Sequence, residues 1–447
     1  MALSASQFGS NFLWGVATSA PQNEGAIFTD GKQASIWDSF SKKILSTADG
    51  TSTQTTPLFY YRFRDDILLA KALGFKVFRI SIAWSRLFPE GTGRANKAGV
   101  QFYHHLIDAI LQMDMIPMVT LYHWDLPLAL EKQGGWTSYK MPRWFQKYTQ
   151  FCATEYGHKV PYWLVLNEPM GFTSLGYMLG KHAPGKTGTA HFFPAVHNAL
   201  LCQSLGIEIL QQHTSGAQIG TTFSMSDVHA FTDDMLDVAA VKRADAWLNK
   251  LFLEPLLGKG LPLDDGGVFM EKLATHNKTW KYTNAYQAKP DFVGIQYYFP
   301  LTVKHSAFIP HINVLAVGAK KRGRPATQLG WEIYPQGLQK VVKTVWKHGS
   351  VKNIWITENG ACFKDTLTKN GINDAERIAY FESHLQVMLK LKQEGVKISG
   401  YVAWTLTDNF EWAFGIKARF GLVHVDFNSL QRTIKESGYW WRKFLTS

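Results

Sequence analysis

The sequence has few cysteines and lacks the features that direct a chain into a membrane or out of the cell. Its 447 residues include 3 cysteines, Cys152, Cys202 and Cys362, with no Cys-x-x-Cys spacing, which argues against a disulfide framework or a cysteine zinc site. The first basic residue is Lys32, so a basic n-region of a secretory signal is missing, and no long apolar run predicts a membrane span. We therefore expect a cytoplasmic protein with no membrane partner.

Acidic residues are also scarce relative to basic ones. The chain carries 35 Asp and Glu against 47 Lys and Arg, a formal net charge of +12 and a pI near 9.3. Such an excess can indicate a nucleic-acid partner, but here the basic residues are dispersed along the chain. We interpret the densest group, Lys320, Lys321, Arg322 and Arg324, as part of a solvated loop. We therefore expect no nucleic-acid partner.

Two apolar runs that each end in a glutamate stand out among the residues that are present. The run Tyr162–Leu166 is followed by Asn167 and Glu168, and the run Ile354–Thr357 is followed by Glu358. An apolar run of this length predicts a strand buried on both faces, which places its last residue at a rim. Two carboxyl groups at one rim could form the acid and carboxylate pair that cleaves glycosidic bonds.

Strand patterns alternate with helical patterns along the whole chain. We expect strands at 12–18, 76–84, 116–122, 162–167, 218–224, 292–298, 353–358 and 398–406, and helices at 60–73, 100–112, 144–156, 197–212, 337–346, 376–394 and 437–445. Eight strands separated by helices, with no repeat or linker, predict an α/β fold in which residues 1–447 form a single catalytic (β/α)8 TIM barrel. The polar strand ends would then meet at one mouth: Gln22, Arg79, His123, Asn167, Glu168, Tyr298, Glu358 and Trp404.

Several longer motifs occur at or near these strand ends. They are the Phe12–Ala20 run with Gln22 and Glu24, Phe78–Arg86, Thr120–Pro127, the two glutamate motifs, Gly330–Pro335 and Trp404–Trp412. In order and spacing they make the sequence resemble glycoside hydrolase family 1, the β-glucosidase family, from Phe12 to Phe427. The resemblance implies a retaining β-glycosidase that hydrolyses β-D-glucosides and related galactosides and fucosides, with no metal and no organic cofactor.

The resemblance assigns different roles to the two glutamates. It implies that Glu168 is the acid/base and Glu358 the nucleophile, with Arg79 and Tyr298 flanking the nucleophile and Asn167 binding the sugar 2-hydroxyl. Elementary electrostatics agrees with this division. The negative charge of one carboxylate disfavours ionisation of the neighbouring carboxyl group, so the pair can hold one proton near neutral pH. A small β-glycoside or short oligosaccharide is the expected partner.

The family positions that contact the rest of the sugar are also present. Gln22, His123, Trp124, Glu411 and Trp412 resemble those that hold the hydroxyl groups, Trp404 resembles the apolar floor, and Trp331 resembles the residue that contacts the leaving group. The branch of the family that cleaves 6-phosphorylated sugars tends to have Ser at the position of Glu411, and Lys and Tyr at the positions of Ala418 and Phe420. Because Glu411 would repel a phosphate, we expect an unphosphorylated substrate.

The sequence departs from the family pattern at a few places. Gln296 stands where Asn is usual, Val165 stands where Thr is usual, and residues 49–56 lack the expected acidic and aromatic pattern. The first two changes keep a buried polar or packing role, whereas the third concerns the shape of an entrance loop.

Other readings of the sequence stay open beside hydrolysis. A barrel of this kind could bind a glycan or a protein with weak or no catalysis, although such a protein would be expected to lose one of the two glutamates. Residues 180–187 match the phosphate-binding Gly-x-x-x-x-Gly-Lys-Thr pattern, but they follow the loop-like region 171–180 instead of a strand. Cys362 has no His motif beside it, so we do not expect it to be a nucleophile.

Overall fold

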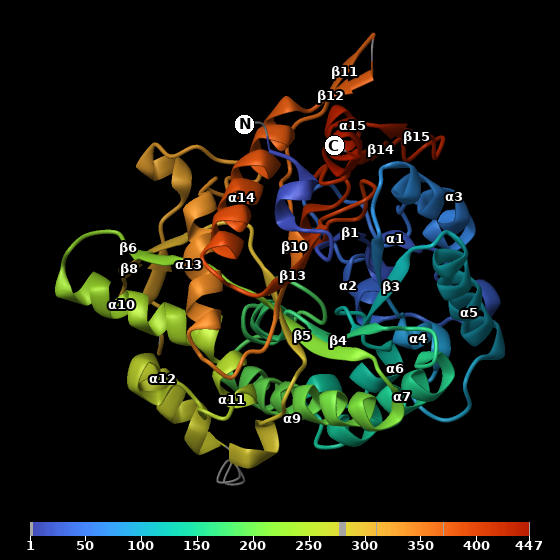
Figure 1. Ribbon diagram of the computed structural model, residues 1–447. Helices are drawn as coiled ribbons and strands as arrows, with labels where there is room; N and C mark the ends of the chain where they lie inside the picture. The colour runs from blue at the N-terminus through green and yellow to red at the C-terminus, as the bar shows by residue number, and fades with distance from the viewer. Residues whose placement is uncertain (1–2, 277–282, 310, 370, 447) are drawn as a thin grey trace.

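Eight parallel strands close into a barrel at the centre of the molecule (Figure 1). The computed structural model describes residues 3–276, 283–309, 311–369 and 371–446. The barrel strands are β1 (Leu13–Ala17), β2 (Val77–Ser81), β3 (Ile116–Tyr122), β4 (Tyr162–Asn167), β5 (Gln218–Ser224), β7 (Phe292–Gln296), β10 (Ile354–Asn359) and β13 (Ile398–Ala403). They follow one another around the barrel in chain order, and β1 pairs with β13 to close it. The predicted (β/α)8 fold class is confirmed.

Helices surround the barrel and connect its strands (Figure 1). The longer ones are α3 (Phe59–Ala72), α5 (Lys97–Gln112), α7 (Met141–Tyr156), α9 (Thr189–His213), α10 (Met235–Asp245), α12 (Leu263–His276), α13 (Pro335–Trp346), α14 (Ala375–Gln393) and α15 (Glu436–Thr446). None of the helices in the described ranges is long and apolar enough to cross a membrane.

Short helical segments lie in the connections. They are η1 (Ala5–Phe8), α1 (Ala20–Asn23), η2 (Thr29–Gly31), α2 (Ile36–Phe40), α4 (Trp84–Leu87), α6 (Leu128–Glu131), η3 (Gly135–Thr137), α8 (Pro169–Thr173), η4 (Ser174–Met178), η5 (Ala246–Lys250), α11 (Leu253–Leu256), η7 (Thr283–Tyr286), η8 (Ala319–Arg322) and η9 (Trp412–Phe414). Three small sheets complete the structure: β6 (Val228–Ala230) with β8 (Leu301–His305) and β9 (Val314–Ala316), β11 (Thr366–Thr368) with β12 (Gly371–Asn373), and β14 (Val423–Val425) with β15 (Arg432–Ile434).

Large apolar side chains fill the inside of the barrel. Val77, Met118, Leu164 and Trp355, from four different strands, belong to one buried cluster. Gly400 on β13 leaves room for this packing, because a Cβ atom there would lie 2.4 Å from the Trp355 ring. A filled interior confines any ligand to the ends of the strands.

The structure corrects several predicted boundaries. The second strand ends at Ser81, three residues before Trp84, which instead begins α4. The sixth and eighth strands end at Gln296 and Ala403, short of the expected 298 and 406. At each position apolar or aromatic residues continue past the last residue of the strand, so composition alone overestimates the length of the strand.

Two regions predicted to be loops contain helical structure. Residues 171–180 include most of α8 and all of η4, and the basic group is largely in η8. Arg322 in that group is not freely solvated, because its guanidinium pairs with the carboxylate of Glu332. Helix α9 starts at Thr189, earlier than predicted, and contains Pro194 in its second turn, where the missing N–H removes one i→i−4 hydrogen bond of the helix.

Candidate active site

The two glutamates singled out by the sequence lie at the same end of the barrel. Glu358 is in β10, one residue before its end, and Glu168 directly follows β4. Glu168 has a φ of 46°, in the left-handed region that few non-glycine residues adopt, and Pro169 then begins α8. Both side chains line one cavity of about 480 Å³. That volume is in the range of small-molecule sites.

Most of the predicted site residues line this same cavity. They are His123, Trp124, Asn167, Glu168, Tyr298, Trp331, Glu358, Trp404, Glu411 and Trp412. The other two, Gln22 and Arg79, are buried behind the wall, where each contacts a lining carboxylate. The structure therefore brings all twelve predicted residues to one place.

The carboxylate of Glu358 is held at both oxygens. Arg79 donates from its NH1 to Oε1 at 2.5 Å, and the Tyr298 hydroxyl donates to Oε2 at 2.5 Å. Burial raises the pKa of Glu358, while the positive charge of Arg79 and the Tyr298 hydrogen bond oppose that rise. Arg79 and Tyr298 thus favour the ionised form of Glu358, whereas burial disfavours it.

No Lys or Arg among the described residues forms an ion pair with Glu168. Burial and the negative charge of Glu358 raise the pKa of Glu168 to about 8, although a hydrogen bond from Ser224 and the more distant Arg79 oppose the rise. Of the two carboxyl groups, Glu168 is therefore the one that keeps a proton at neutral pH.

Asn167 is the centre of a hydrogen-bond group beside the pair. Its Oδ1 accepts from Arg79 NH2 at 2.5 Å and from Gln296 Nε2 at 2.8 Å, and its Nδ2 lies 3.1 Å from His123 Nε2. Gln296, one of the residues that depart from the family pattern, thus reaches Asn167 with its amide. Burial and then Arg79 lower the pKa of His123 well below its usual value, so the ring is neutral.

Aromatic rings form the floor and one wall of the cavity. The ring of His123 stacks on Trp404 and on Trp412, with centroids 6.0 Å apart in both pairs, and Trp124 stacks on Trp412 at 4.8 Å. Glu411 lies among them and accepts hydrogen bonds from the Trp404 indole and from Gln22. Burial and the charge of Glu358 raise the pKa of Glu411 to about 8.

A second aromatic group lies around Trp331. Its ring is within 6.3 Å, centroid to centroid, of each of four others: Tyr298, Phe299, Phe414 and Phe420. Because Tyr298 also contacts Glu358, this aromatic wall borders the reacting groups on one side.

A family profile matches nearly all of this barrel. The profile of "Glycosyl hydrolase family 1" matches residues 4–447. The chain belongs to glycosyl hydrolase family 1. This confirms the family that the motifs suggested.

Named relatives in glycosyl hydrolase family 1 are similar over their whole length. The chain is 36% identical to Beta-glucosidase A of Thermotoga maritima over 98% of each chain, and 35% identical to Beta-glucosidase A of Acetivibrio thermocellus, also over 98% of each. A solved structure of the Thermotoga maritima β-glucosidase in complex with glucoimidazole superposes with a TM-score of 0.92, at 35% identity and 98% coverage of both chains. The complex with deoxynojirimycin has a TM-score of 0.93 at 36% identity, again with 98% of both chains covered.

Sequence reasoning missed several lining residues of this family 1 site. Leu175, Lys181, His182, Ser224, Phe299 and Phe414 also face the cavity, together with Phe420, which the sequence marked only as a position without the tyrosine of the 6-phosphate branch. The rule that strand ends carry chemistry would have found Ser224, the last residue of β5, and Phe299, which follows β7. The others come from long connections whose path the sequence does not reveal.

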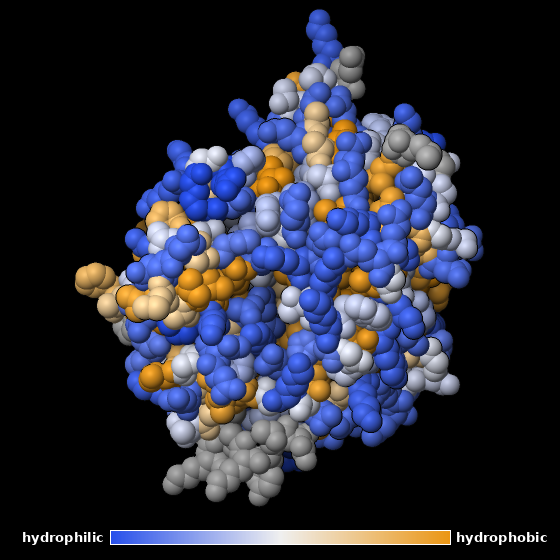
Figure 2. Space-filling model, turned by 60° about the vertical axis from the view of Figure 1, so that its left-hand side comes forward, coloured by the Kyte–Doolittle hydropathy of each residue, from blue (hydrophilic) through white to orange (hydrophobic). Residues whose placement is uncertain are grey.

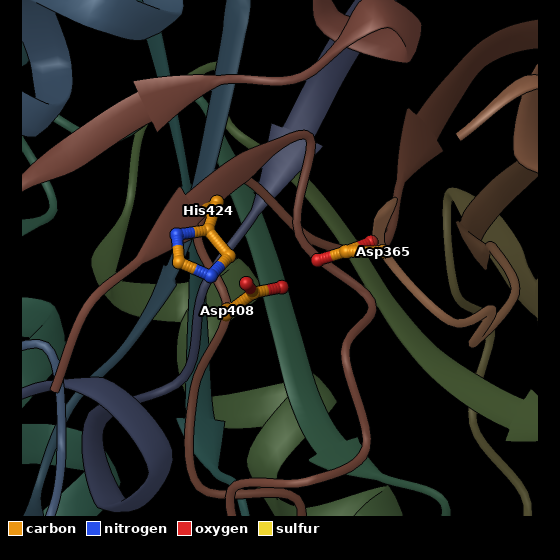
Figure 3. A group of neighbouring side chains, drawn as sticks. All are labelled: Asp365, Asp408 and His424. Carbon is orange, nitrogen blue, oxygen red and sulfur yellow. The ribbon is translucent and has the colours of Figure 1, made fainter. Parts of the chain in front are cut away.

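One group of side chains elsewhere has the composition of a metal site. Ligand atoms of Asp365, Asp408 and His424 lie within 4.8 Å of one another (Figure 3). However, Lys435 Nζ lies 2.7 Å from Asp365 and 2.8 Å from Asp408, and Arg419 NH1 lies 2.9 Å from Asp408. Side-chain cations therefore already balance these carboxylates, and the group does not fit a metal ion well.

Proposed function

We propose that this chain is a retaining β-glycosidase that hydrolyses unphosphorylated β-D-glucosides and related β-glycosides such as galactosides and fucosides. The observation that carries the proposal is the unequal environment of the two carboxyl groups in one cavity. Glu358 has a guanidinium and a phenol on its oxygens, whereas Glu168 has a raised pKa of about 8. A retaining mechanism needs this combination of one carboxylate and one carboxylic acid.

In the first step, the Glu358 carboxylate attacks the anomeric carbon while Glu168 gives its proton to the glycosidic oxygen. The bond to the aglycone breaks, the aglycone leaves as an alcohol, and a glycosyl ester of Glu358 forms. Arg79 and Tyr298 keep the attacking oxygen ionised and oriented until the ester forms. Asn167 is the proposed partner of the 2-hydroxyl, a contact that strengthens in the transition state.

In the second step, Glu168 acts as a base. Esterification removes the negative charge of Glu358, which is one of the causes of the raised pKa of Glu168. Glu168 is then stable as a carboxylate and takes a proton from a water molecule, whose oxygen attacks the anomeric carbon. The ester bond breaks, and the sugar is released with its original β configuration.

The walls of the cavity suit an unphosphorylated glucose unit. His123 Nδ1 is buried and has no hydrogen-bond partner among the described residues, so it is available to a sugar hydroxyl. Gln22, Trp124, Glu411 and Trp412 are the other proposed hydroxyl contacts, Trp404 the floor, and Trp331 the contact to the aglycone. Among the described lining residues Lys181 is the only Lys or Arg, so Glu411 has no cation beside it to balance a 6-phosphate.

The relatives and the geometry support hydrolysis over binding alone. A barrel that only bound glycans would have no need to keep Arg79 and Tyr298 on Glu358 or a raised pKa on Glu168. We further propose that residues 1–447 act as one catalytic domain, because both carboxyl groups come from strands of the same closed barrel. The proposed location is a reducing cytosol, in keeping with three free, buried cysteines.

Stereochemistry provides the test of this function. The enzyme should release the β-anomer of glucose first from an aryl β-glucoside, as followed by proton NMR within the first minutes, before mutarotation. Initial release of the α-anomer would contradict a retaining mechanism. As a second comparison, a faster turnover of the corresponding 6-phosphoglucoside than of the plain glucoside would contradict the proposed substrate class.

A further inference from the structure

Residues 327–334 separate the active-site cavity from a second cavity. Trp331 lines the first, while Glu332 and Tyr334 line the second, which has a volume of about 540 Å³. The segment is a hairpin, since Thr327 N donates to Trp331 O at 2.8 Å and Ala326 pairs with Glu332. The second cavity therefore adjoins the Trp331 wall that faces the proposed aglycone.

The second cavity is rich in positive charge. Its lining includes Lys321, Arg322 and Arg324 and a single carboxylate, that of Glu332. Glu332 is paired with Arg322, and the side chains of both are largely buried. Within the described part of the chain, Lys321 and Arg324 form no ion pair. Both side chains are exposed, so this cavity presents two solvated cations that could pair with an anionic ligand.

The rest of the lining is suited to a carbohydrate. Tyr334 and Phe231 line the cavity, and Phe231 is 46% exposed. The edge of His229 packs against Tyr334 at 5.6 Å, which fixes the tyrosine ring. An aromatic face beside polar groups favours a ring with one apolar face, as a sugar has. The volume is in the range that holds a small ligand.

The surrounding surface does not indicate a macromolecular partner. Figure 2 turns forward the side that carries α10, α13 and the β6–β8–β9 sheet in Figure 1. Hydrophilic side chains predominate on this face, and apolar ones form separate groups instead of one continuous patch. The local basic cavity is therefore a better candidate for a binding site on this face than an extended apolar surface.

We propose that this basic cavity binds a carboxylate at the far end of the aglycone, so that the enzyme prefers β-glucosides whose aglycone is an acidic oligosaccharide. Lys321 and Arg324 contact the carboxylate, and Tyr334 and Phe231 contact the sugar ring that carries it. The inference rests on the proposed function, because the glucose at the other end of the same ligand occupies the active-site cavity.

Matched oligosaccharides provide the test. Cello-oligosaccharides of two to five units are compared with the same oligosaccharides oxidised at the reducing end to the aldonate, which places one carboxylate at the far end. At the length that reaches the cavity, kcat/KM should be roughly 3- to 10-fold higher for the oxidised form, the size expected of two solvent-screened charge contacts. The preference should disappear in 0.5 M NaCl.

Variants of the basic group identify the cavity. The double variant Lys321→Gln/Arg324→Gln should lose the preference while hydrolysing the neutral oligosaccharide as before. Lys320→Gln is the matched control, because Lys320 lies in the same η8 segment but does not line the cavity. It should keep the preference. Glu332→Gln should increase the preference, since it releases Arg322 from its ion pair.

Several outcomes would overturn the inference. The inference would be wrong if no oligosaccharide length showed a preference for the oxidised form. It would also be wrong if the double variant kept the preference, because Lys321 and Arg324 would then have no role in aglycone binding. If free gluconate inhibited hydrolysis of the oxidised oligosaccharide equally in wild type and in the double variant, the cavity would not be the carboxylate site. Two measurements distinguish failure of this inference from failure of the proposed function. Absence of turnover by the wild-type enzyme would contradict the proposed function. Equal calorimetric affinity of the Glu358→Gln variant for the neutral and the oxidised oligosaccharide would contradict the assignment of the cavity.

Discussion

The two glutamates differ through the side chains that touch them. Arg79 contacts Glu358 Oε1 and Asn167 Oδ1 with different nitrogens of one guanidinium, and Thr120 accepts from its Nε. A planar fork with fixed donors can orient both partners at once, which a lysine ammonium cannot do. Arg79 is therefore proposed as the residue that makes Glu358 the nucleophile of the pair.

Replacing Arg79 should reduce catalysis and shift its pH dependence. We expect Arg79→Lys to lower kcat by roughly 10²-fold, the size of an effect seen when an oriented electrostatic contact is removed. Without the guanidinium, the effect of burial on Glu358 is less well counteracted, so the pKa of Glu358 should rise. The acidic limb of the kcat/KM profile should then move to higher pH. Arg62→Lys is the control, because Arg62 pairs with Asp65 on the surface. An unchanged acidic limb would contradict this role for Arg79.

The alkaline limb of the profile should report Glu168. Its pKa of about 8 means that the proton needed by the leaving group is present at neutral pH and is lost as the pH rises through that value. We expect kcat/KM for an alkyl β-glucoside to fall above about pH 8. For a dinitrophenyl glucoside, whose leaving group needs little protonation, the limb should be much weaker. Equal limbs for the two substrates would count against Glu168 as the acid.

Removing the charge of Glu358 should lower the pKa of Glu168. The negative charge of Glu358 is the second cause of the raised value, after burial. In Glu358→Gln that cause is absent, so the carboxyl of Glu168 should titrate at lower pH than in wild type. Carbon-13 NMR of labelled glutamate carboxyls measures this directly, with Glu168→Gln used to assign the signal. A titration that stays near pH 8 would show that burial alone sets the value.

At the scale of elements, the strands that deliver the carboxyl groups were predictable and the small sheets were not. Buried runs such as Trp163–Leu166 on β4 have a composition that only a strand with two covered faces explains. The strands β6 and β9 have three residues each, and their pairing to β8 depends on contacts between distant parts of the chain. A run of three residues has no periodicity to recognise.

The connection after β13 depends on a buried ionic group. Asp408 accepts from Lys435 Nζ at 2.8 Å, from Arg419 NH1 at 2.9 Å and from Gly421 N at 2.9 Å, which joins this connection to β14 and to the start of α15. Although burial raises it, the charges of Lys435 and Arg419 hold the pKa of Asp408 below its ordinary value. The same connection carries Glu411 and Trp412 to the cavity.

Breaking this ionic group should destabilise the protein. Asp408→Asn leaves the buried Lys435 ammonium with less compensation, and we expect a loss of about 3–5 kcal/mol in the free energy of unfolding. Denaturant unfolding at neutral pH measures it. Asp426→Asn is the control, because Asp426 is exposed and its carboxylate accepts hydrogen bonds from the neighbouring Asn428 and Ser429 of its own turn, so its effect should stay within about 0.5 kcal/mol. Equal stability of the two variants would contradict a structural role for Asp408.

At the scale of the whole molecule, the sequence predicted the barrel and the place of its chemistry, because each of the eight strands could be recognised independently even where its end was misplaced. Arg79 is an example, since an arginine within an apolar strand requires a carboxylate partner and the structure supplies Glu358. The basic residues Lys321 and Arg324 show the limit. Their sequence context indicates solvated residues, and both are exposed, but only the fold places them beside Phe231 and Tyr334 at a cavity.

The central claim is that Glu358 is the nucleophile and Glu168 the acid/base of a retaining β-glucosidase. The most direct test is to react the enzyme with dinitrophenyl 2-deoxy-2-fluoro-β-glucoside and map the covalent label by mass spectrometry. The account predicts one label, esterified to Glu358, with activity lost in proportion to labelling. Attachment to Glu168 or to any other residue, or continued turnover of aryl β-glucosides without any label, would contradict it.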